Sequence, residues 1–145
     1  LVGRGSLTAI PTALVAEFPG RVRWTPELPT AGVAAAMDRA TALLLPSRSE
    51  GLPRIVVEAF CRGRAVIGTQ AGGIPDIVRD GESGLVVPVE DPAALAEAMV
   101  RLVSEPDLAA RLGAGARSDA DRWIATPAEN ARRTRELVET VLERG

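Results

Sequence analysis

The chain has 145 residues, of which 46% are hydrophobic and 25% charged, the balance of one soluble globular domain with its own core. A formal net charge of −2, without a long basic run, argues against a nucleic-acid-binding protein. The absence of histidine and the presence of a single cysteine exclude a Cys/His zinc site, a Ser-His-Asp triad and an internal disulfide within this chain. Any chemistry therefore rests on carboxylates, arginines, hydroxyls and backbone groups.

The sequence shows neither a membrane anchor nor a signal peptide. No apolar run approaches the roughly 20 residues of a membrane-spanning helix, and Leu1 begins an apparent strand. Because the chain starts without an initiator Met, we expect a fragment of a longer protein. The lone Cys61 lies in an apolar helical pattern, which predicts a small buried hydrophobe. A reducing compartment follows, so we expect a cytoplasmic protein, either free or at the inner face of the membrane.

Short apolar runs of β type alternate with segments of helical periodicity along the chain. The runs cover residues 1–2, 22–24, 42–45, 65–67 and 84–87. This alternation predicts βαβ units and places the chain in the α/β class, as a Rossmann-like doubly wound parallel sheet with helices on both faces. No linker or internal repeat divides residues 1–145, which we treat as one domain.

Two helices are expected in the first third of the chain. Residues 6–16 have helical character, but a proline in a helix interior removes a backbone hydrogen bond, so the helix should begin near Pro11. Residues 30–40 carry apolar side chains on one face and predict an amphipathic helix.

Three further helices are expected after the last strand. Asp91 offers an N-cap oxygen and Pro92 suits the first helical position, which predicts a helix over residues 92–104. Pro106 marks the start of a second helix, and the pair at 126–127 begins a C-terminal helix over residues 127–145. The many charges of this last helix indicate a solvated face, with partner docking as the alternative.

Two glutamates stand out because of where they lie. Glu50 is in the loop after the run at 42–45, Glu58 is in the helix that follows, and seven residues separate them. Open α/β sheets bind ligands at the carboxyl ends of their strands, so two carboxylates here indicate a ligand site. The plain alternative is that Glu58 is a surface helix residue and Glu50 caps a turn.

The start of that helix predicts an anion site. The N–H groups around Gly51, Leu52 and Arg54 lack intrahelical partners, and the helix dipole is positive at this end, which suits a diphosphate. Glu58 can accept two hydrogen bonds from a vicinal diol such as ribose. Arg54 and Arg48 are candidates for further phosphate contacts, with simple solvation as the alternative.

Two glycine pairs weigh less as indicators of a site. Gly3-Arg4-Gly5 follows a strand but lacks the third glycine of a dinucleotide fingerprint, so a plain tight turn is favoured. Gly72-Gly73 either lets the chain turn close to the ligand face or forms a purely structural turn.

The segment from residue 46 to residue 92 carries a specific set of motifs. They are Pro46-Ser47, Glu50-Gly51, Glu58-Ala59, Gly63, Val66-Ile67-Gly68-Thr69, Gly72-Gly73-Ile74-Pro75-Asp76-Ile77-Val78, Asp80-Gly81, Gly84-Leu85-Val86-Val87-Pro88 and Asp91-Pro92. In this pattern the chain resembles the C-terminal, donor-binding domain of retaining GT-B glycosyltransferases of the glycosyl transferases group 1 (GT4-like) family. Weaker similarity reaches residues 1–5 and 22–24, so the resemblance covers most of the chain.

The resemblance implies a role for each candidate residue. Glu50 would lie beside the transferred sugar as the catalytic residue, and Glu58 would hold the ribose. Backbone N–H groups of Gly51 and Leu52 would meet the diphosphate, with Ser47 and Arg54 also on the donor side. The loop that begins with Thr25 and Pro26 would lie near the base.

The implied reaction moves a sugar from a nucleotide-sugar donor to an acceptor hydroxyl, with retention at the anomeric carbon. Stabilisation of the departing diphosphate by preorganised donors is the implied device, so neither a metal nor a cofactor beyond the nucleotide-sugar substrate is expected. A non-catalytic nucleotide-binding or interaction domain of the same fold is the alternative function.

Several parts of the family pattern are absent from this chain. The run from Ala59 to Ala65 lacks the usual proline, which should alter only a turn. The Arg and Lys that grip the diphosphate would precede Leu1, as would the N-terminal domain that binds the acceptor, be it a glycan, a lipid or a small molecule. We therefore expect no turnover by the chain alone.

The resemblance also implies a gap in the sheet. In the order 3-2-1-4-5-6 the first strand lies between this chain's own first and third strands, and this chain lacks it. We expect another chain to fill the gap, or the fragment to rearrange or self-associate.

Overall fold

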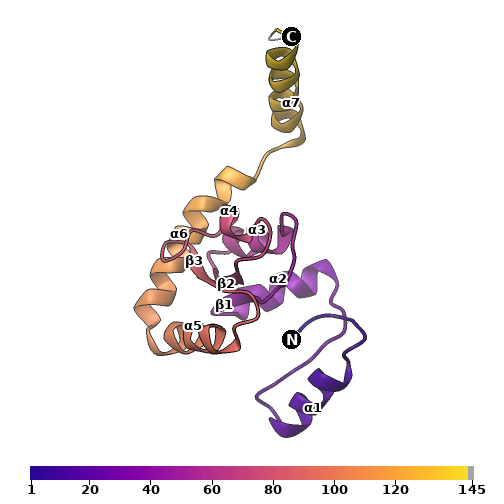
Figure 1. The fold of residues 1–145 in the computed structure, drawn as a ribbon, viewed down its shortest axis with the longest axis vertical. Coiled ribbons are helices and arrows are strands. Elements are labelled where there is room, and N and C mark those ends of the chain that lie inside the picture. The colour runs from indigo at the N-terminus through magenta and orange to yellow at the C-terminus, as the bar shows by residue number, and fades with distance from the viewer. Residues whose placement is uncertain (144–145) are drawn as a thin grey trace. The chain divides into compact units, whose positions relative to one another are not determined.

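The computed structural model describes residues 1–143 (Figure 1). The internal contacts divide the chain into two compact units, residues 1–39 and residues 40–145. The division falls between the second and third of the expected strands.

The first unit contains two helices and a single β-bridge. Helix α1 spans Ala9–Glu17 and α2 spans Thr30–Arg39. Pro11 lies in the first turn of α1, where an N–H has no intrahelical acceptor, so the helix begins two residues earlier than predicted. The prediction for residues 30–40 is confirmed to within one residue.

The prediction of strands at residues 1–2 and 22–24 is wrong. They are reduced to one isolated parallel bridge between Val2 and Thr25. In this bridge the Gly3 N–H donates to the Thr25 carbonyl at 3.1 Å and the Thr25 N–H donates to the Leu1 carbonyl at 2.9 Å. The local pattern was extended, but a pair of strands without further neighbours has little to stabilise it.

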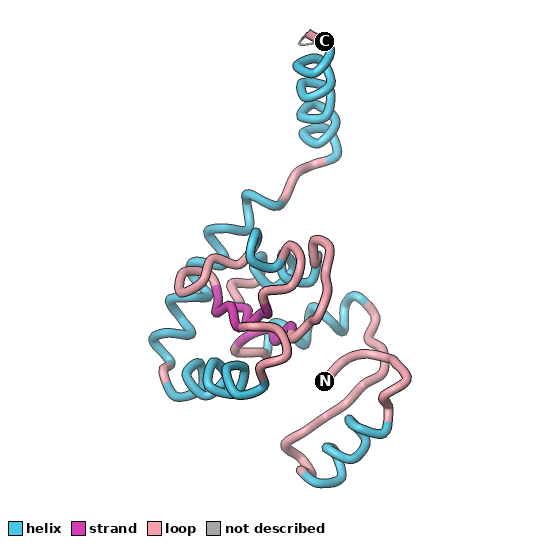
Figure 2. Tube along the Cα trace, in the orientation of Figure 1, coloured by secondary structure: helices cyan, strands magenta, loops and turns pink. Residues whose placement is uncertain are grey.

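The second unit is built on a parallel sheet of three strands (Figure 2). These are β1 (Ala42–Leu45), β2 (Ala65–Thr69) and β3 (Gly84–Val87), in the order β1-β2-β3. The register pairs Leu44 with Ile67 and Ile67 with Leu85. All five residues of β2 are buried, as expected for the central strand of a parallel sheet covered on both faces.

As far as residue 143, this unit has five helices. They are α3 (Arg54–Cys61), α4 (Ile74–Ile77), α5 (Pro92–Ser104), α6 (Pro106–Trp123) and α7 (Pro127–Leu142). The predictions for α5, for the start of α6 and for the start of α7 are confirmed, and the end of the predicted last helix, residues 144–145, lies outside the described residues. Pro53 is the N-cap of α3, and its backbone is extended.

Helices cover both faces of the sheet, which gives the doubly wound α/β class that was expected. On one face the core cluster joins Ile67 and Leu85 to Leu102 of α5 and Leu112 of α6. On the other face, around α4, the Ile74 side chain lies so close to Gly68 that a Cβ there would be 2.7 Å from it. None of the helices within residues 1–143 has the length and apolar character needed to cross a membrane.

A charged cluster ties α6 to the turn after α4. Arg79 donates from Nε and Nη2 to the two carboxylate oxygens of buried Asp119, at 2.8 and 2.7 Å, and also pairs with Glu82. These hydrogen bonds raise the pKa of Arg79 above its ordinary value, and the bonds to Asp119 contribute most. At Gly115 of α6 a Cβ would lie 2.0 Å from the Glu82 carbonyl oxygen, so this turn packs directly on the helix backbone.

Cys61 is exposed, which corrects the prediction that it is buried. The buried residues of α3 are Val56, Ala59 and Phe60. Cys61 follows this stripe by one residue, and a further 100° of helical rotation turns it toward solvent.

Candidate functional site

The loop between β1 and α3, residues 46–53, forms the centre of the candidate site. It leaves the carboxyl end of β1, the same edge of the sheet at which β2 and β3 end, because all three strands are parallel. Glu50 lies in this loop and is half-buried, and Glu58 is the fifth residue of α3 and is also half-buried. Ligands of open parallel sheets bind at this edge.

The side chain of Glu50 is held by its own loop. The Ser47 hydroxyl donates to the Glu50 carboxylate at 2.6 Å, a charge-assisted hydrogen bond. The carbonyl oxygen of Ser47 accepts in turn from the Thr69 hydroxyl at 2.5 Å. Thr69 is the last residue of β2 and is 4% exposed, so a buried hydroxyl supports the loop that carries Glu50.

The backbone of the same loop rests on the glycine pair after β2. The Gly73 N–H donates to the Gly51 carbonyl at 2.8 Å. A Cβ on Gly72 would lie 1.8 Å from the Glu50 carbonyl oxygen, and one on Gly73 would lie 2.6 Å from the Gly51 carbonyl oxygen. Residues 72 and 73 therefore allow a backbone contact that any side chain would prevent.

The start of α3 presents unused donors. Within residues 1–143, the amide groups of Gly51 and Leu52 donate no hydrogen bond. Both residues are exposed, as is Arg54 at the first position of α3. Unused N–H groups just before a helix, one and two residues after a fixed carboxylate, can bind an anionic group and a hydroxyl-bearing group side by side.

Arg48 has a different environment from the one considered in the sequence. Its Nε pairs with the Glu90 carboxylate at 2.9 Å, and both side chains are more than half exposed, at 82% and 64%. Such an exposed pair contributes little to stability. Glu90 has a positive φ of 57° in the loop after β3.

The structure brings together some of the predicted residues and not others. Ser47 and Glu50 are in direct contact, and Gly51, Leu52 and Arg54 follow in the same loop and helix start. Thr25 and Pro26 belong to the first unit. Sequence reasoning missed Thr69 as a site residue, although a hydroxyl residue at the end of an apolar strand, three residues before Gly72, was a usable signal.

Other sites on the second unit are weaker candidates. A cavity of about 250 Å³ lies over β3 and α5, lined in part by Asp80, Glu97 and Arg101, and none of the predicted site residues lines it. Among residues 1–143, no cluster of three or more acidic or cysteine side chains has the geometry to hold a metal ion.

Comparisons with known proteins agree with the fold and the motifs. The model of the family "Glycosyl transferases group 1" matches residues 1–105. The D-inositol 3-phosphate glycosyltransferase of Streptomyces bingchenggensis is 37% identical over 102 residues, covering 70% of this chain and 22% of that protein. The protein of the same name from Frankia alni is 38% identical over 107 residues, covering 72% of this chain and 26% of that protein.

Solved structures show the same fold. Sucrose-phosphate synthase from Thermosynechococcus elongatus superposes with a TM-score of 0.81 at 26% identity, covering all of this chain and 38% of that one. Anabaena HepE in complex with UDP superposes with a TM-score of 0.82 at 19% identity, covering 96% of this chain and 40% of that one.

This chain spans about a quarter of the length of the curated relatives it matches, with 22% and 26% coverage for these two. The family match nevertheless covers well over half of the chain and includes the whole candidate site. The chain belongs to the glycosyl transferases group 1 family.

Proposed function

We propose that this chain is the donor-binding part of a retaining glycosyltransferase, which moves a sugar from a nucleotide-sugar to an acceptor hydroxyl. The observation that carries the proposal is Glu50, fixed by Ser47 at 2.6 Å next to the unused amides of Gly51 and Leu52. A carboxylate beside the sugar and amides at the leaving diphosphate are preorganised for charge that develops during transfer.

Each residue has a role in this proposal. Glu50 acts beside the transferred sugar, and the amides of Gly51 and Leu52 bind the diphosphate. Glu58 accepts hydrogen bonds from the ribose hydroxyls, one and a half turns into α3. Arg54 adds positive charge beside the diphosphate, and the loop at Thr25 and Pro26 lies near the base.

The proteins similar to this chain support a nucleotide-sugar as the donor. The relatives are named glycosyltransferases, and HepE, which has the same fold, has been solved with UDP and with UDP-glucose. A sugar diphosphate needs no metal in this scheme, because backbone donors and cations of the protein neutralise the diphosphate. The acceptor would be bound by another part of a longer protein, which would also supply further cations. The reaction would take place on the cytoplasmic side.

The test is donor binding and turnover by the full-length protein that contains this chain, with UDP-, GDP- and ADP-sugars screened by calorimetry. We expect Glu58→Ala to weaken donor binding by about 10-fold or more, the cost of a hydrogen bond to a charged group. We expect Glu50→Gln to keep donor binding and lose turnover. Glu139→Gln, at an exposed glutamate of α7, is the matched control.

Two results would contradict parts of this proposal. Undiminished donor binding by Glu58→Ala would remove Glu58 from the site. If the full-length protein binds the donor but neither hydrolyses it nor transfers the sugar, the alternative holds, and the chain is a non-catalytic nucleotide-binding domain of the same fold.

We also propose that the isolated chain self-associates through the outer edge of β1. Within residues 1–143 this edge makes no backbone hydrogen bond, whereas the outer edge of β3 is occupied by its own turn. There the Val86 N–H donates to the Asp80 carboxylate at 2.9 Å and the Gly81 N–H donates to the Gly84 carbonyl at 2.9 Å. Open strand edges template pairing with other chains. A concentration-independent monomer in sedimentation would contradict this expectation.

A further inference from the structure

The loop after β2 contacts the candidate catalytic loop at three separate points. The Thr69 hydroxyl reaches the Ser47 carbonyl, the Gly73 N–H reaches the Gly51 carbonyl, and Gly72 lies against the Glu50 carbonyl. Each contact joins residues 22 positions apart along the chain. They bracket Glu50 on both sides, at positions 47 and 51.

The three contacts differ in what they require. Gly72 has a φ of +51°, so both its conformation and the nearby Glu50 carbonyl demand glycine. Gly73 has an ordinary φ of −81°, so only the 2.6 Å approach to the Gly51 carbonyl excludes a side chain there. Position 69 requires only a hydroxyl group, because the contact is made by the Thr69 hydroxyl alone. Valine has almost the same shape as threonine but cannot donate this hydrogen bond.

We propose that Thr69 and Gly73 are positioning residues that set the side chain and the backbone of Glu50 for sugar transfer. Thr69 acts through Ser47: its hydroxyl holds the Ser47 carbonyl, and the Ser47 hydroxyl holds the Glu50 carboxylate. Gly73 acts through Gly51, whose carbonyl it binds and whose amide faces the diphosphate in the proposed function. The inference rests on that proposed function, and neither residue needs to touch the donor.

The two residues should leave different kinetic signatures. Loss of the Thr69 hydroxyl displaces Glu50 while Glu58 keeps its place, so it should lower kcat and leave KM for the donor nearly unchanged. A methyl group on Gly73 displaces both Glu50 and the Gly51 amide, so it should lower kcat and raise KM. Small displacements of a reacting group can cost about 100-fold in rate.

The experiment uses steady-state kinetics of the full-length protein with four variants. We expect Thr69→Val to lower kcat by about 10-fold to 100-fold, and Thr69→Ser, which restores the hydroxyl, to recover most of it. Gly73→Ala should change kcat and KM together. Thr134→Val, at an exposed threonine of α7 whose hydroxyl bonds only within its helix, is the matched control and should behave as wild type.

A structural measurement tests the Gly73 contact directly, and the turnover results separate this inference from the proposed function. In the 145-residue chain we expect slow hydrogen exchange at the Gly73 amide, because it donates to the Gly51 carbonyl. In Gly73→Ala the amide of residue 73 should exchange faster, because the added methyl group moves Gly51 away. If Glu50→Gln retains full turnover, the role proposed for Glu50 fails. If Glu50→Gln loses turnover while Thr69→Val and Thr69→Ser both keep wild-type kcat, Glu50 stands and the positioning inference is overturned.

Discussion

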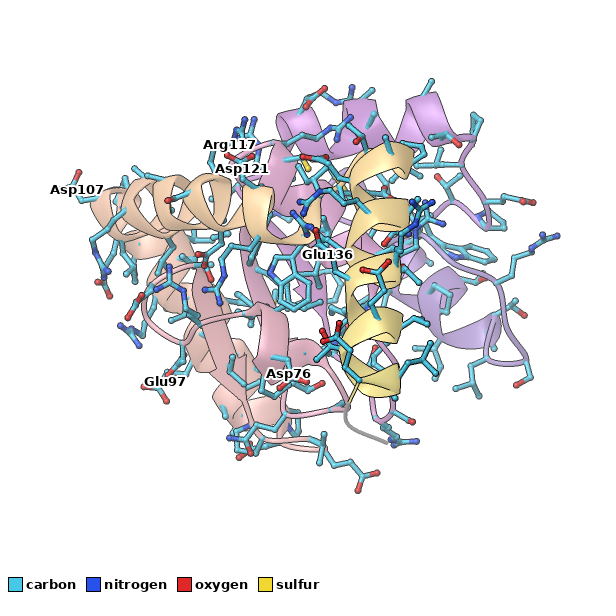
Figure 3. All side chains as sticks on the ribbon, turned by 90° about the horizontal axis from the view of Figure 1, so that it is seen from above. Asp76, Glu97, Asp107, Arg117, Asp121 and Glu136 are labelled. Carbon is cyan, nitrogen blue, oxygen red and sulfur yellow. The ribbon has the colours of Figure 1, made fainter. Side chains whose placement is uncertain are left out.

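The loop at residues 46–53 and helix α7 are held in place in opposite ways. The loop is held by groups distant in sequence, Thr69, Gly72 and Gly73, through hydrogen bonds and backbone contact. Helix α7, which carries the labelled Glu136 in Figure 3, has no buried residue. Its polar contacts are local: a capping box joins Thr126 and Glu129, and Arg132 pairs with Glu136 at 2.7 Å. Substitutions in the first region should therefore change global stability, whereas those in the second should change only the helix.

The largest expected effect comes from Gly72→Ala. Its Cβ would lie 1.8 Å from the Glu50 carbonyl oxygen, and the residue has a left-handed φ of +51°. We expect a loss of about 4 kcal/mol in the free energy of unfolding, from a conformational cost of about 1–2 and an overpacking cost of up to about 3. Urea denaturation measures it.

Gly81→Ala is the matched control for this prediction. Gly81 also has a left-handed φ, of +73°, but a Cβ there would meet nothing within 4 Å. It should cost only the conformational part, about 1–2 kcal/mol. Equal losses at positions 72 and 81 would show that the contact with Glu50 does not constrain the loop.

The second prediction compares two leucines on successive helices. Leu112 of α6 is fully buried, and Leu137 of α7 is 65% exposed. We expect Leu112→Ala to lower the free energy of unfolding by about 3 kcal/mol through lost burial and a cavity. Leu137→Ala should stay within about 0.5 kcal/mol. A loss at Leu137 close to that at Leu112 would show that the apolar face of α7 is packed in solution.

The same contrast explains which features the sequence could predict. The starts of α5 and α7 were predicted because their signals are local: Asp91 accepts from the Ala94 N–H at 2.9 Å, and Thr126 accepts from the Glu129 N–H at 3.2 Å. The placement of Glu50 after a strand followed from the alternation of elements. That placement needed no knowledge of side-chain contacts.

The errors arose where distant parts of the chain decide the outcome. The expected strands at 1–2 and 22–24 have the right local pattern, but pairing depends on neighbours, and only one bridge forms. Gly72-Gly73 could be recognised as a turn, yet its contact with the Glu50–Gly51 backbone joins two loops that no local pattern connects. The Thr69 hydroxyl was missed for the same reason.

The third prediction concerns the capping box of α7. The Thr126 hydroxyl accepts from the Glu129 N–H, and the Glu129 carboxylate accepts from the Thr126 N–H at 2.8 Å. We expect Thr126→Ala to destabilise the helix by about 1 kcal/mol, the usual cost of losing an N-cap side chain. Hydrogen exchange of the α7 amides should speed up while the β2 amides are unchanged. A parallel change in β2 would mean that α7 and the sheet unfold together.

The smallest expected effect is a pH dependence confined to α7. The Thr126 N–H, followed by the Thr126 hydroxyl, lowers the pKa of Glu129 below its ordinary value. A carboxylate whose pKa is lower in the folded state contributes its stability fully above the ordinary glutamate pKa of about 4.3, and loses it as the pH falls through the folded-state value. The helicity of a peptide over residues 124–143 should therefore be constant above about pH 5 and fall below it.

Glu129→Gln isolates this titration. The amide oxygen can still accept from the Thr126 N–H, so the capping box is retained, but the side chain no longer ionises. Near neutral pH the variant should lose only the part of the helicity that the charge adds at the positive end of the helix dipole. Its acid-induced loss should be smaller than that of the wild-type peptide, because the glutamine side chain cannot be protonated in this range. An acid-induced loss as large as that of the wild type would show that the ionisation of Glu129 does not set the pH dependence, and α7 would then owe little to its charged cap.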